Sequence, residues 1–442
     1  MKVLIIAAGK GSRLRRKYHP KPLVPVLGVP LIERVIRSAL DAGFDDFYVV
    51  TGFEGQKVRL FLDKLAAGAP LKNLTHLTNE AWEEGNGLSV LKAEEHLRDK
   101  FVLLMADHLF DPGILRKLKQ QPLKNGEVTL AVDPGMNNCF TNPDDATRVE
   151  LQNGKIVNIG KDIEPYSAFD TGIFLSSPAI FEGIRESISN YNDSSLSGGV
   201  RCLAAKGRVN AFLAEGQFWI DVDDPGALDK AENLLLNQQQ KSKAADGPVS
   251  RYINRPLSKR ISRYLARSSI TPNQISLLAF MFSLLAAGLF AVNGYVTLAL
   301  GGLVAQLASI LDGCDGEVAR LKFRETSFGG WFDAVLDRYA DALLLFGLTW
   351  HAYAGGGGKT ALLAGFLAII GSFMLSYTAD KYDALMRERI ESSAWPRLGR
   401  DVRIFLVFLG ALANLPLLTL LVIAALMNAE TVRRVLVCRP HG

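Results

Sequence analysis

Four aspartates in the C-terminal half of the chain have the spacing of a metal site. Asp312 and Asp315 are three residues apart, and Asp333 and Asp337 are four residues apart. On helices, each pair would share one face, and two facing helices would bring four carboxylates to one point. Hard divalent cations such as Mg²⁺ (or Mn²⁺) prefer oxygen ligands, and two of them can clamp a phosphoryl group. The spacing therefore indicates metal-assisted phosphoryl transfer.

All four aspartates lie beside long apolar stretches, where an uncompensated carboxylate is costly. An alternative is that they are helix-end charges whose side chains reach water. Three small residues among them, Gly316, Ala319 and Gly329, favour a site instead, because small side chains let a backbone or a ligand approach closely.

The complete pattern has eight fixed positions. It reads Asp312-x-x-Asp315-Gly316-x-x-Ala319-Arg320, then eight residues, then Gly329-x-x-x-Asp333-x-x-x-Asp337. This pattern resembles the signature of the CDP-alcohol phosphotransferase family, and the resemblance covers roughly residue 251 to the C-terminus. It implies an integral-membrane enzyme in which an acceptor hydroxyl displaces CMP from a CDP-alcohol. In such an enzyme Asp312, Asp315 and Asp333 would hold the metals, and Gly316, Ala319 and Arg320 would line the CDP site.

Asp337 is expected to have two roles in that reaction, as a metal neighbour and as the base that deprotonates the acceptor hydroxyl. Lys381, Arg400 and Arg403 are candidates for binding a phosphate on the acceptor. These three could equally be ordinary positive charges on the cytoplasmic side of a membrane.

A glycine loop near the N-terminus could bind phosphate. Ala8, Gly9, Gly11 and Ser12 directly follow a short apolar run, and such a loop can turn backbone N–H groups toward phosphate oxygens. Arg13 and Lys21 could neutralise a triphosphate. By itself the loop could also be an ordinary turn.

An ordered set of motifs strengthens the phosphate interpretation. Its members are Ala7-Ala8-Gly9-x-Gly11-x-Arg13-Leu14, Lys21-Pro22-Leu23, the stretch with Gly85, Asn86 and Ser89, then Asp107, Lys161, 169–172, Asp221 and Asp223. The set resembles the sugar-nucleotide type of nucleotidyltransferase over about residues 1–232. The resemblance implies base recognition by Gly85, Asn86 and Ser89, and binding of the substrate's phosphate by Lys161.

The same resemblance implies a divalent metal at Asp107 and Asp223, with Asp221 beside it, and catalytic roles for Arg13 and Lys21 on the pyrophosphate side. No nucleophilic side chain is needed, because orientation and charge compensation suffice for attack on an α-phosphorus. Alternatively, Asp107 could cap the end of a strand, and Asp221 and Asp223 could belong to a solvated loop.

The surrounding pattern indicates which elements position these residues. Short apolar runs at 3–7, 46–51, 102–105 and 128–132 predict strands, and 31–41, 56–65 and 88–96 predict helices. Their alternation predicts a parallel sheet covered on both faces. We therefore expect an α/β Rossmann-like nucleotidyltransferase domain over 1–232, followed by a polar linker over 233–249.

The remainder, 250–442, predicts an all-α six-helix transmembrane domain. A basic amphipathic stretch over 252–265 is typical of a helix that lies in the membrane interface. The apolar stretches are at about 272–292, 294–311, 333–354, 358–380, 402–413 with its flanks, and 416–437. Basic residues concentrate in alternate loops, which predicts a multi-pass protein of the cell membrane with the N-terminal domain and both active sites on the cytoplasmic side.

Composition narrows the remaining possibilities. The four cysteines have neither paired spacing nor histidine partners, so neither a disulfide framework nor a zinc site is indicated. The net charge of +5 is modest, and no nucleic acid is expected among the partners. The expected partners are CTP, an alcohol phosphate, a CDP-alcohol, the lipid bilayer and a second copy of the chain, joined through the membrane domain.

One half thus resembles an enzyme that makes an activated alcohol, and the other resembles an enzyme that consumes one. Their fusion resembles the family of bifunctional inositol-1-phosphate cytidylyltransferases and di-inositol-phosphate phosphate synthases. It implies that CTP and inositol 1-phosphate give CDP-inositol, whose inositol phosphate then passes to a second inositol 1-phosphate. Three alternatives remain: a synthase with a lipid acceptor, a phosphocholine-type cytidylyltransferase in the first domain, and a transporter with a nucleotide-sensing domain. The acids cluster at one end of the apolar stretches, which disfavours the transporter alternative.

Overall fold

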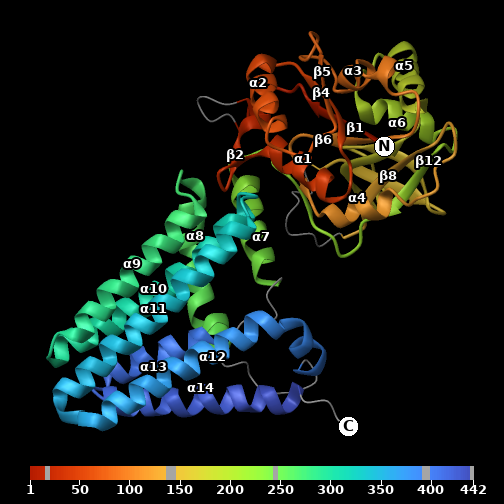
Figure 1. The fold of residues 1–442 in the computed structure, drawn as a ribbon. Coiled ribbons are helices and arrows are strands. Elements are labelled where there is room, and N and C mark those ends of the chain that lie inside the picture. The colour runs from red at the N-terminus through yellow and green to blue at the C-terminus, as the bar shows by residue number, and fades with distance from the viewer. Residues whose placement is uncertain (15–19, 136–145, 242–246, 391–398, 439–442) are drawn as a thin grey trace. The chain divides into compact units, whose positions relative to one another are not determined.

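The computed structural model describes residues 1–14, 20–135, 146–241, 247–390 and 399–438, without the side chains of 240, 241, 379–390 and 438. These residues form two compact units, Met1–Leu234 and Leu235–Gly442 (Figure 1). Each unit has its own core and its own candidate site.

A nine-stranded sheet forms the centre of the first unit, with the order β5-β4-β1-β6-β11-β8-β12-β10-β9. The strands are β1 (Lys2–Ala7), β4 (Asp46–Thr51), β5 (Asn73–Thr78), β6 (Phe101–Met105), β8 (Val128–Asp133), β9 (Arg148–Gln152), β10 (Lys155–Gly160), β11 (Ala168–Ser176) and β12 (Val209–Leu213). All four predicted strands are present, as β1, β4, β6 and β8.

The sheet is mixed, so the prediction of a parallel sheet is wrong where β11, β10 and β9 pair antiparallel with their neighbours, although β12 is parallel to β8. Strands β5, β4, β1 and β6 are parallel, but β11 runs antiparallel to both β6 and β8. Short connections explain the difference. Only Asn153 and Gly154 separate β9 from β10, whereas a parallel crossover needs a dozen residues or more.

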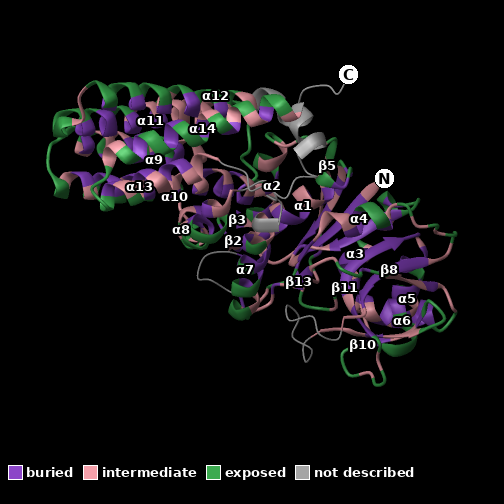
Figure 2. Cartoon of the chain, turned by 90° about the horizontal axis from the view of Figure 1, so that it is seen from below, coloured by how far each residue is buried: buried purple, intermediate pink, exposed green. Residues whose placement is uncertain are grey.

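Helices cover both faces of this sheet, as predicted. Helices α1 (Leu31–Asp41), α2 (Gly55–Ala66) and α4 (Pro112–Leu118) pack on the face that receives Val3 and Ile5 of β1. Helices α3 (Gly87–Leu91), α5 (Ala179–Tyr191) and α6 (Leu196–Ala204) pack on the face that receives Leu4 and Ile6 (Figure 2). Alternate side chains of one strand thus enter two cores, which explains its uninterrupted apolar sequence.

Two predicted segments differ from the structure. The helix expected over 88–96 is divided into α3 and a 3₁₀ turn at Glu94–His96. Helix α7 (Pro225–Lys241) extends well into the stretch expected to be a linker. Its run of Ala, Leu, Glu and Gln favours helix, and the Asp224 carboxylate accepts a hydrogen bond from the Ala227 amide at 2.8 Å near its start.

Two small ribbons complete the first unit. Strand β2 (Pro25–Val26) pairs with β3 (Val29–Pro30), and β7 (His108–Phe110) pairs antiparallel with β13 (Trp219–Asp221). The second ribbon places His108 directly opposite Asp221. It therefore joins two parts of the chain that are more than a hundred residues apart.

The described part of the second unit is all-α. Its helices are α8 (Arg255–Arg267), α9 (Pro272–Ala291), α10 (Tyr295–Leu321), α11 (Ser327–Ala352), α12 (Gly358–Ile390), α13 (Arg400–Leu412) and α14 (Pro416–Cys438). Polar caps fix two of the starts: the Thr271 hydroxyl accepts from the Gln274 amide, and the Thr326 hydroxyl accepts from the Gly329 amide at 2.9 Å. The second cap places the motif glycine in the first turn of α11.

Among the residues that the structure describes, three stretches are long and apolar enough to cross a membrane: Pro272–Ala291, Tyr295–Leu321 and Ser327–Thr378, the last of which includes α11 and part of α12. The predicted number of six membrane-spanning helices is not confirmed. Helix α13 has only 13 residues, about 20 Å, which is shorter than a bilayer core of about 30 Å.

Candidate active sites

The first site is built around Lys21, which follows the glycine loop and begins a 3₁₀ turn. Its Nζ lies 2.5 Å from Asp107 Oδ2 and 3.9 Å from Asp221 Oδ1, and it also donates to Asp223. Lys21 is only 8% exposed, and burial lowers its pKa, but the three carboxylates together raise that pKa above its ordinary value. The ammonium group is therefore charged.

The three acids come from different parts of the fold. Asp107 follows strand β6, Asp221 ends β13, and Asp223 follows two residues later. Burial raises the pKa of Asp107, but the charges of Lys21 and His108 outweigh it and hold that pKa at about 2. The structure thus brings together the predicted residues Lys21, Asp107, Asp221 and Asp223.

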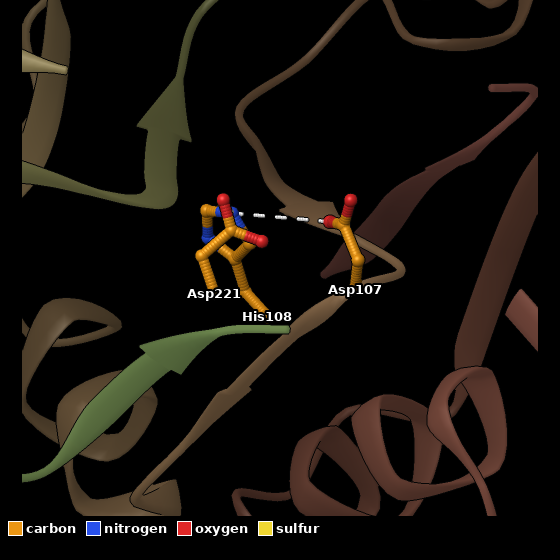
Figure 3. Close-up of side chains that lie close together, drawn as sticks. All are labelled: Asp107, His108 and Asp221. Carbon is orange, nitrogen blue, oxygen red and sulfur yellow. Dashed lines mark ion pairs between the residues drawn. The ribbon is translucent and has the colours of Figure 1, made fainter. Parts of the chain in front are cut away.

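His108 was missed by the sequence analysis and lies beside Asp221, with its ring facing Asp107 (Figure 3). Its Nε2 is 3.8 Å from Asp107 Oδ1 and 3.5 Å from Asp221 Oδ2, and its Nδ1 is 2.8 Å from the Thr171 carbonyl oxygen. Burial lowers the pKa of His108, but Asp221 and then Asp107 raise it to about 10. Its place next to Asp107 was the only signal in the sequence.

The donor set fits a divalent cation. Asp107, His108 and Asp221 each bring one candidate ligand atom within 4.8 Å of the others, and His108 would coordinate only after losing the proton that its raised pKa retains. Among the described residues, Asp221 Oδ1 is buried without a hydrogen-bond partner. A buried oxygen without a donor is costly, and a cation would satisfy it. The Lys21 ammonium group supplies positive charge to the same group of carboxylates.

An open cavity of about 340 Å³ contains this cluster. Its described lining includes Asp107, Asp221, Asp223, Asn86 and Lys161, and also Asp170 and His108. Burial raises the pKa of Asp170 to about 6, although the Gly172 amide donates to its carboxylate at 2.7 Å and partly offsets that rise. A carboxyl group with a pKa this close to neutral pH is partly protonated. It can therefore donate a hydrogen bond to a polyol hydroxyl or accept one from it.

The remaining predicted residues of the first site do not line this cavity. Ala8, Gly9, Ser12, Arg13, Gly85 and Ser89 are not among its described lining residues. Gly11 has a positive φ of 59°, and a Cβ there would collide with the Lys21 side chain, so the loop backs that lysine closely. Gly85 donates its amide to Ser194 Oγ at 3.0 Å, and Ser89 accepts from Asn79 at 3.0 Å, so both fix the position of their loop.

The second site lies where α10 faces α11. The four motif carboxylates Asp312, Asp315, Asp333 and Asp337 line one cavity of about 320 Å³, together with Arg400. Oxygen atoms of Asp312, Asp333 and Asp337 lie within 4.8 Å of one another, and Asp315 accepts hydrogen bonds from Ser276 and from the Gly316 amide. The expected convergence of two helical pairs is therefore present.

This donor set also fits a divalent cation. Asp333 Oδ1 is buried without a hydrogen-bond partner among the described residues, and several carboxylates face one arginine. Hard cations satisfy such an excess of anionic oxygen. Gly316, Ala319 and Arg320 follow on the next turn of α10 but are outside the described lining, and Arg320 Nε donates to Gln239 at 2.5 Å.

The two described arginines predicted for the acceptor's phosphate occupy different environments. Arg400 Nη1 lies 2.7 Å from both Asp312 Oδ2 and Asp337 Oδ1, inside the cavity. Arg403 is 1% exposed, pairs with Asp341 and is not among the described lining residues, so its predicted contact with substrate does not match its position. The side chain of Lys381 lies outside the described residues.

Two buried acids were missed by the sequence analysis. Asp341 lies one turn beyond Asp337 on α11 and pairs with Arg400 and Arg403. Glu317, 4% exposed, accepts from Arg255 at 2.5 Å and from Ser258 and Ser262 of α8. Asp341 continues the four-residue spacing of Asp333 and Asp337, and this spacing is the sequence signal that could have identified it. Arg255 was expected on a membrane-interface helix and instead turns inward.

Comparison with known proteins agrees with the two sites. The MobA-like NTP transferase domain family matches residues 3–155, and the CDP-alcohol phosphatidyltransferase family matches residues 269–435. A Rubrobacter xylanophilus protein named bifunctional IPC transferase and DIPP synthase is 38% identical over 439 residues, which are 98% of this chain and 95% of that protein.

Two further relatives cover one half each. The archaetidylinositol phosphate synthase of Pyrococcus horikoshii is 31% identical over 186 residues, which are 41% of this chain and 90% of that protein. A solved structure of the inositol-1-phosphate CTP transferase from T. maritima is 26% identical, covers 55% of this chain and 96% of its own, and has a TM-score of 0.48.

Fold, sites and matched families define a bifunctional transferase, with a nucleotidyltransferase and a CDP-alcohol phosphotransferase on one membrane-associated chain. The chain belongs to the family of bifunctional IPC transferases and DIPP synthases, since the match to the Rubrobacter protein spans nearly the whole of both chains. The family resemblances drawn from the motifs are confirmed.

Proposed function

We propose that this chain carries out two consecutive reactions. The first joins CTP and inositol 1-phosphate into CDP-inositol and releases pyrophosphate. The second transfers inositol phosphate from CDP-inositol to a second inositol 1-phosphate and releases CMP. The observation that carries the proposal is the presence of two separate acidic sites, one in each unit. The relative that matches nearly the whole chain has the name of a bifunctional enzyme.

In the first site, charge compensation and orientation drive the reaction. Lys21, which stays protonated, and Arg13 hold the phosphates of CTP, while Lys161 binds inositol 1-phosphate. Gly85, Asn86 and Ser89 recognise the base, and Ala8, Gly9, Gly11 and Ser12 supply the phosphate loop. A divalent cation, Mg²⁺ or Mn²⁺, held by Asp107, Asp221 and Asp223 would neutralise the phosphates as they approach. The inositol phosphate oxygen then attacks the α-phosphorus, and pyrophosphate leaves.

In the second site, Asp337 takes the proton of the acceptor hydroxyl. Arg400 Nη1, at 2.7 Å, fixes the position of this carboxylate and offers its other N–H groups to the acceptor's phosphate. Gly316, Ala319 and Arg320 hold the CDP group, and Lys381 adds positive charge for the acceptor. A divalent cation at Asp312, Asp315 and Asp333, with Asp337 beside it, would stabilise the leaving CMP.

We also propose how the chain is organised in the cell. Residues 1–232 form the cytidylyltransferase, 233–249 connect it, and 250–442 form the membrane phosphotransferase, whose α8 lies near the interface. Concentration of basic residues in alternate loops supports a multi-pass protein with both sites on the cytoplasmic side. The exposed apolar side chains of the membrane helices support contact with the lipid bilayer and association of two copies.

The proposal is tested with purified full-length protein, CTP, Mg²⁺ and a panel of alcohol phosphates. Inositol 1-phosphate should support release of pyrophosphate and then of CMP, and mass spectrometry should identify CDP-inositol and a di-inositol product. Equal turnover with every alcohol phosphate, or none with inositol 1-phosphate, would contradict the assigned substrate.

A lipid acceptor is the second candidate. It is favoured by the similarity of the membrane half to the Pyrococcus protein whose name describes an archaetidylinositol phosphate synthase. Labelled inositol 1-phosphate distinguishes the two: a lipid acceptor moves the label into an organic extract, and the proposed acceptor keeps it in water.

A further inference from the structure

Helix α11 continues its acidic row beyond the motif. Asp333, Asp337 and Asp341 recur every four residues and share one face of the helix. Asp341 is 1% exposed, although it lies within a stretch apolar enough to cross a membrane. A buried carboxylate there must be compensated, and α13 supplies two arginines three residues apart, Arg400 and Arg403.

The two oxygens of Asp341 divide these arginines between them. Oδ1 lies 3.1 Å from Arg400 Nε, and Oδ2 accepts from Arg403 Nη2. Arg403 Nη1 also lies 3.5 Å from the Ser372 carbonyl oxygen on α12. Asp341 therefore joins α11 to α13, and Arg403 extends the connection to α12.

This contact determines where the Arg400 guanidinium group points. One N–H, at Nε, is fixed by Asp341, while Nη1 bridges Asp312 and Asp337 at 2.7 Å each. The guanidinium group is planar, so contacts on two of its nitrogens fix the whole group. Without the Nε contact, Arg400 could rotate about the two motif carboxylates.

We propose that Asp341 is a positioning residue of the transfer reaction. It holds Arg400 so that the remaining N–H groups can receive a phosphate monoester on the acceptor, and Arg403 is the buried counter-ion of Asp341 instead of a substrate ligand. This inference rests on the proposed function only in taking the acceptor to be phosphorylated.

The test starts from CDP-inositol and inositol 1-phosphate with full-length protein. Asp341→Asn should raise the KM for inositol 1-phosphate about 10- to 100-fold, the typical worth of a hydrogen bond to a charged group. Binding of CMP should change less than about twofold. In an Arg400→Ala background, Asp341→Asn should not raise the KM for inositol 1-phosphate any further, because the residue through which Asp341 acts has been removed.

Glu430 is the matched control, because it is a buried acid that pairs with two arginines, Arg433 and Arg434, away from the cavity. Glu430→Gln removes a similar ion cluster and should leave the KM for inositol 1-phosphate unchanged. If Asp341→Asn prevents folding, Asp341→Asn with Arg403→Gln removes both charges and should restore CMP binding while keeping the raised KM.

Two outcomes would overturn the positioning role. One is a KM that Asp341→Asn leaves unchanged. The other is an equal further loss in the Arg400→Ala background, which would indicate a general structural effect. Failure of the proposed function is recognised separately, because wild-type protein would then make no product from inositol 1-phosphate.

Discussion

At the scale of single residues, each site holds its carboxylates against at least one basic side chain. Lys21 faces Asp107 and Asp223 in the first unit, and Arg400 faces Asp312 and Asp337 in the second. In the first site, Lys21 and His108 hold the pKa of Asp107 at about 2, so this carboxylate stays ionised and ready to bind a metal. Such clusters also make the sites sensitive to loss of a single partner.

Asp337→Asn should lower turnover of CDP-inositol by roughly 100-fold or more, because it removes the proton acceptor while preserving size. CMP binding, measured by titration calorimetry, should change much less. An equal loss of CMP binding would mark Asp337 as mainly a metal ligand, and near-normal turnover would remove it from the mechanism altogether.

Asp170 should make the first unit pH-sensitive. Burial raises its pKa in the folded protein to about 6, above the ordinary value of 3.8, so its stabilising contribution is complete below about pH 4 and is lost as pH rises through 6. Asp170→Asn keeps an acceptor for the Gly172 amide but cannot ionise. In this variant, the protection of the β11 amides from hydrogen exchange, relative to wild type, should therefore be greater at pH 7 than at pH 5. The same difference in protection at pH 5 and at pH 7 would contradict the raised pKa of Asp170.

The sequence was informative about residues with regular spacing or a long ordered motif. The paired aspartates and Asp107, Asp221 and Asp223 meet where expected. His108 was not predicted because its role depends on the pairing of β7 with β13, which no local pattern reveals. Arg403 was misassigned because its sequence position shows a charge but not the buried Asp341 that pairs with it.

At the scale of elements, helix–helix ion pairs assemble the second site. Arg255 and Glu317 join α8 to α10 directly beside the motif. Sequence periodicity identified α8, but its amphipathic pattern placed every basic side chain at the membrane surface. The buried partner on α10 could not be recognised before the two helices were brought together.

Arg255→Ala should destabilise the membrane unit by about 3–5 kcal/mol, since Glu317 would remain buried without its cation. Thermal unfolding in detergent should show a lower transition for this unit. Arg260→Ala, which removes an exposed arginine from the same helix, serves as the control and should stay within about 0.5 kcal/mol of wild type. A comparable loss of stability in both variants would contradict a stabilising role for the Arg255–Glu317 pair.

At the scale of the whole molecule, each unit contains its own acidic cluster, so the two activities should be separable. Asp107→Ala should abolish pyrophosphate release from CTP and leave transfer from supplied CDP-inositol intact. Asp312→Ala should give the reverse result. Both are measured by release of pyrophosphate and CMP from full-length protein. Loss of both activities in either well-folded variant would contradict the two-site account.

Fold class and order of the two units followed from the change in sequence pattern near residue 250, because burial in water and burial in lipid select different compositions. The sequence pattern did not predict the strand directions in the second half of the sheet or the length of α7. They depend on connection lengths and on packing, which local periodicity does not contain.

The identity of the product tests the central claim most directly. Full-length protein is incubated with CTP, Mg²⁺ and inositol 1-[³²P]phosphate, and the extracted products are treated with alkaline phosphatase. The account predicts a water-soluble product and one CMP for each pyrophosphate. Phosphatase should release half of the product's label, because one phosphate is a monoester and the other a diester. Label in the organic phase, or a product that phosphatase leaves fully labelled, would contradict transfer to a second inositol 1-phosphate.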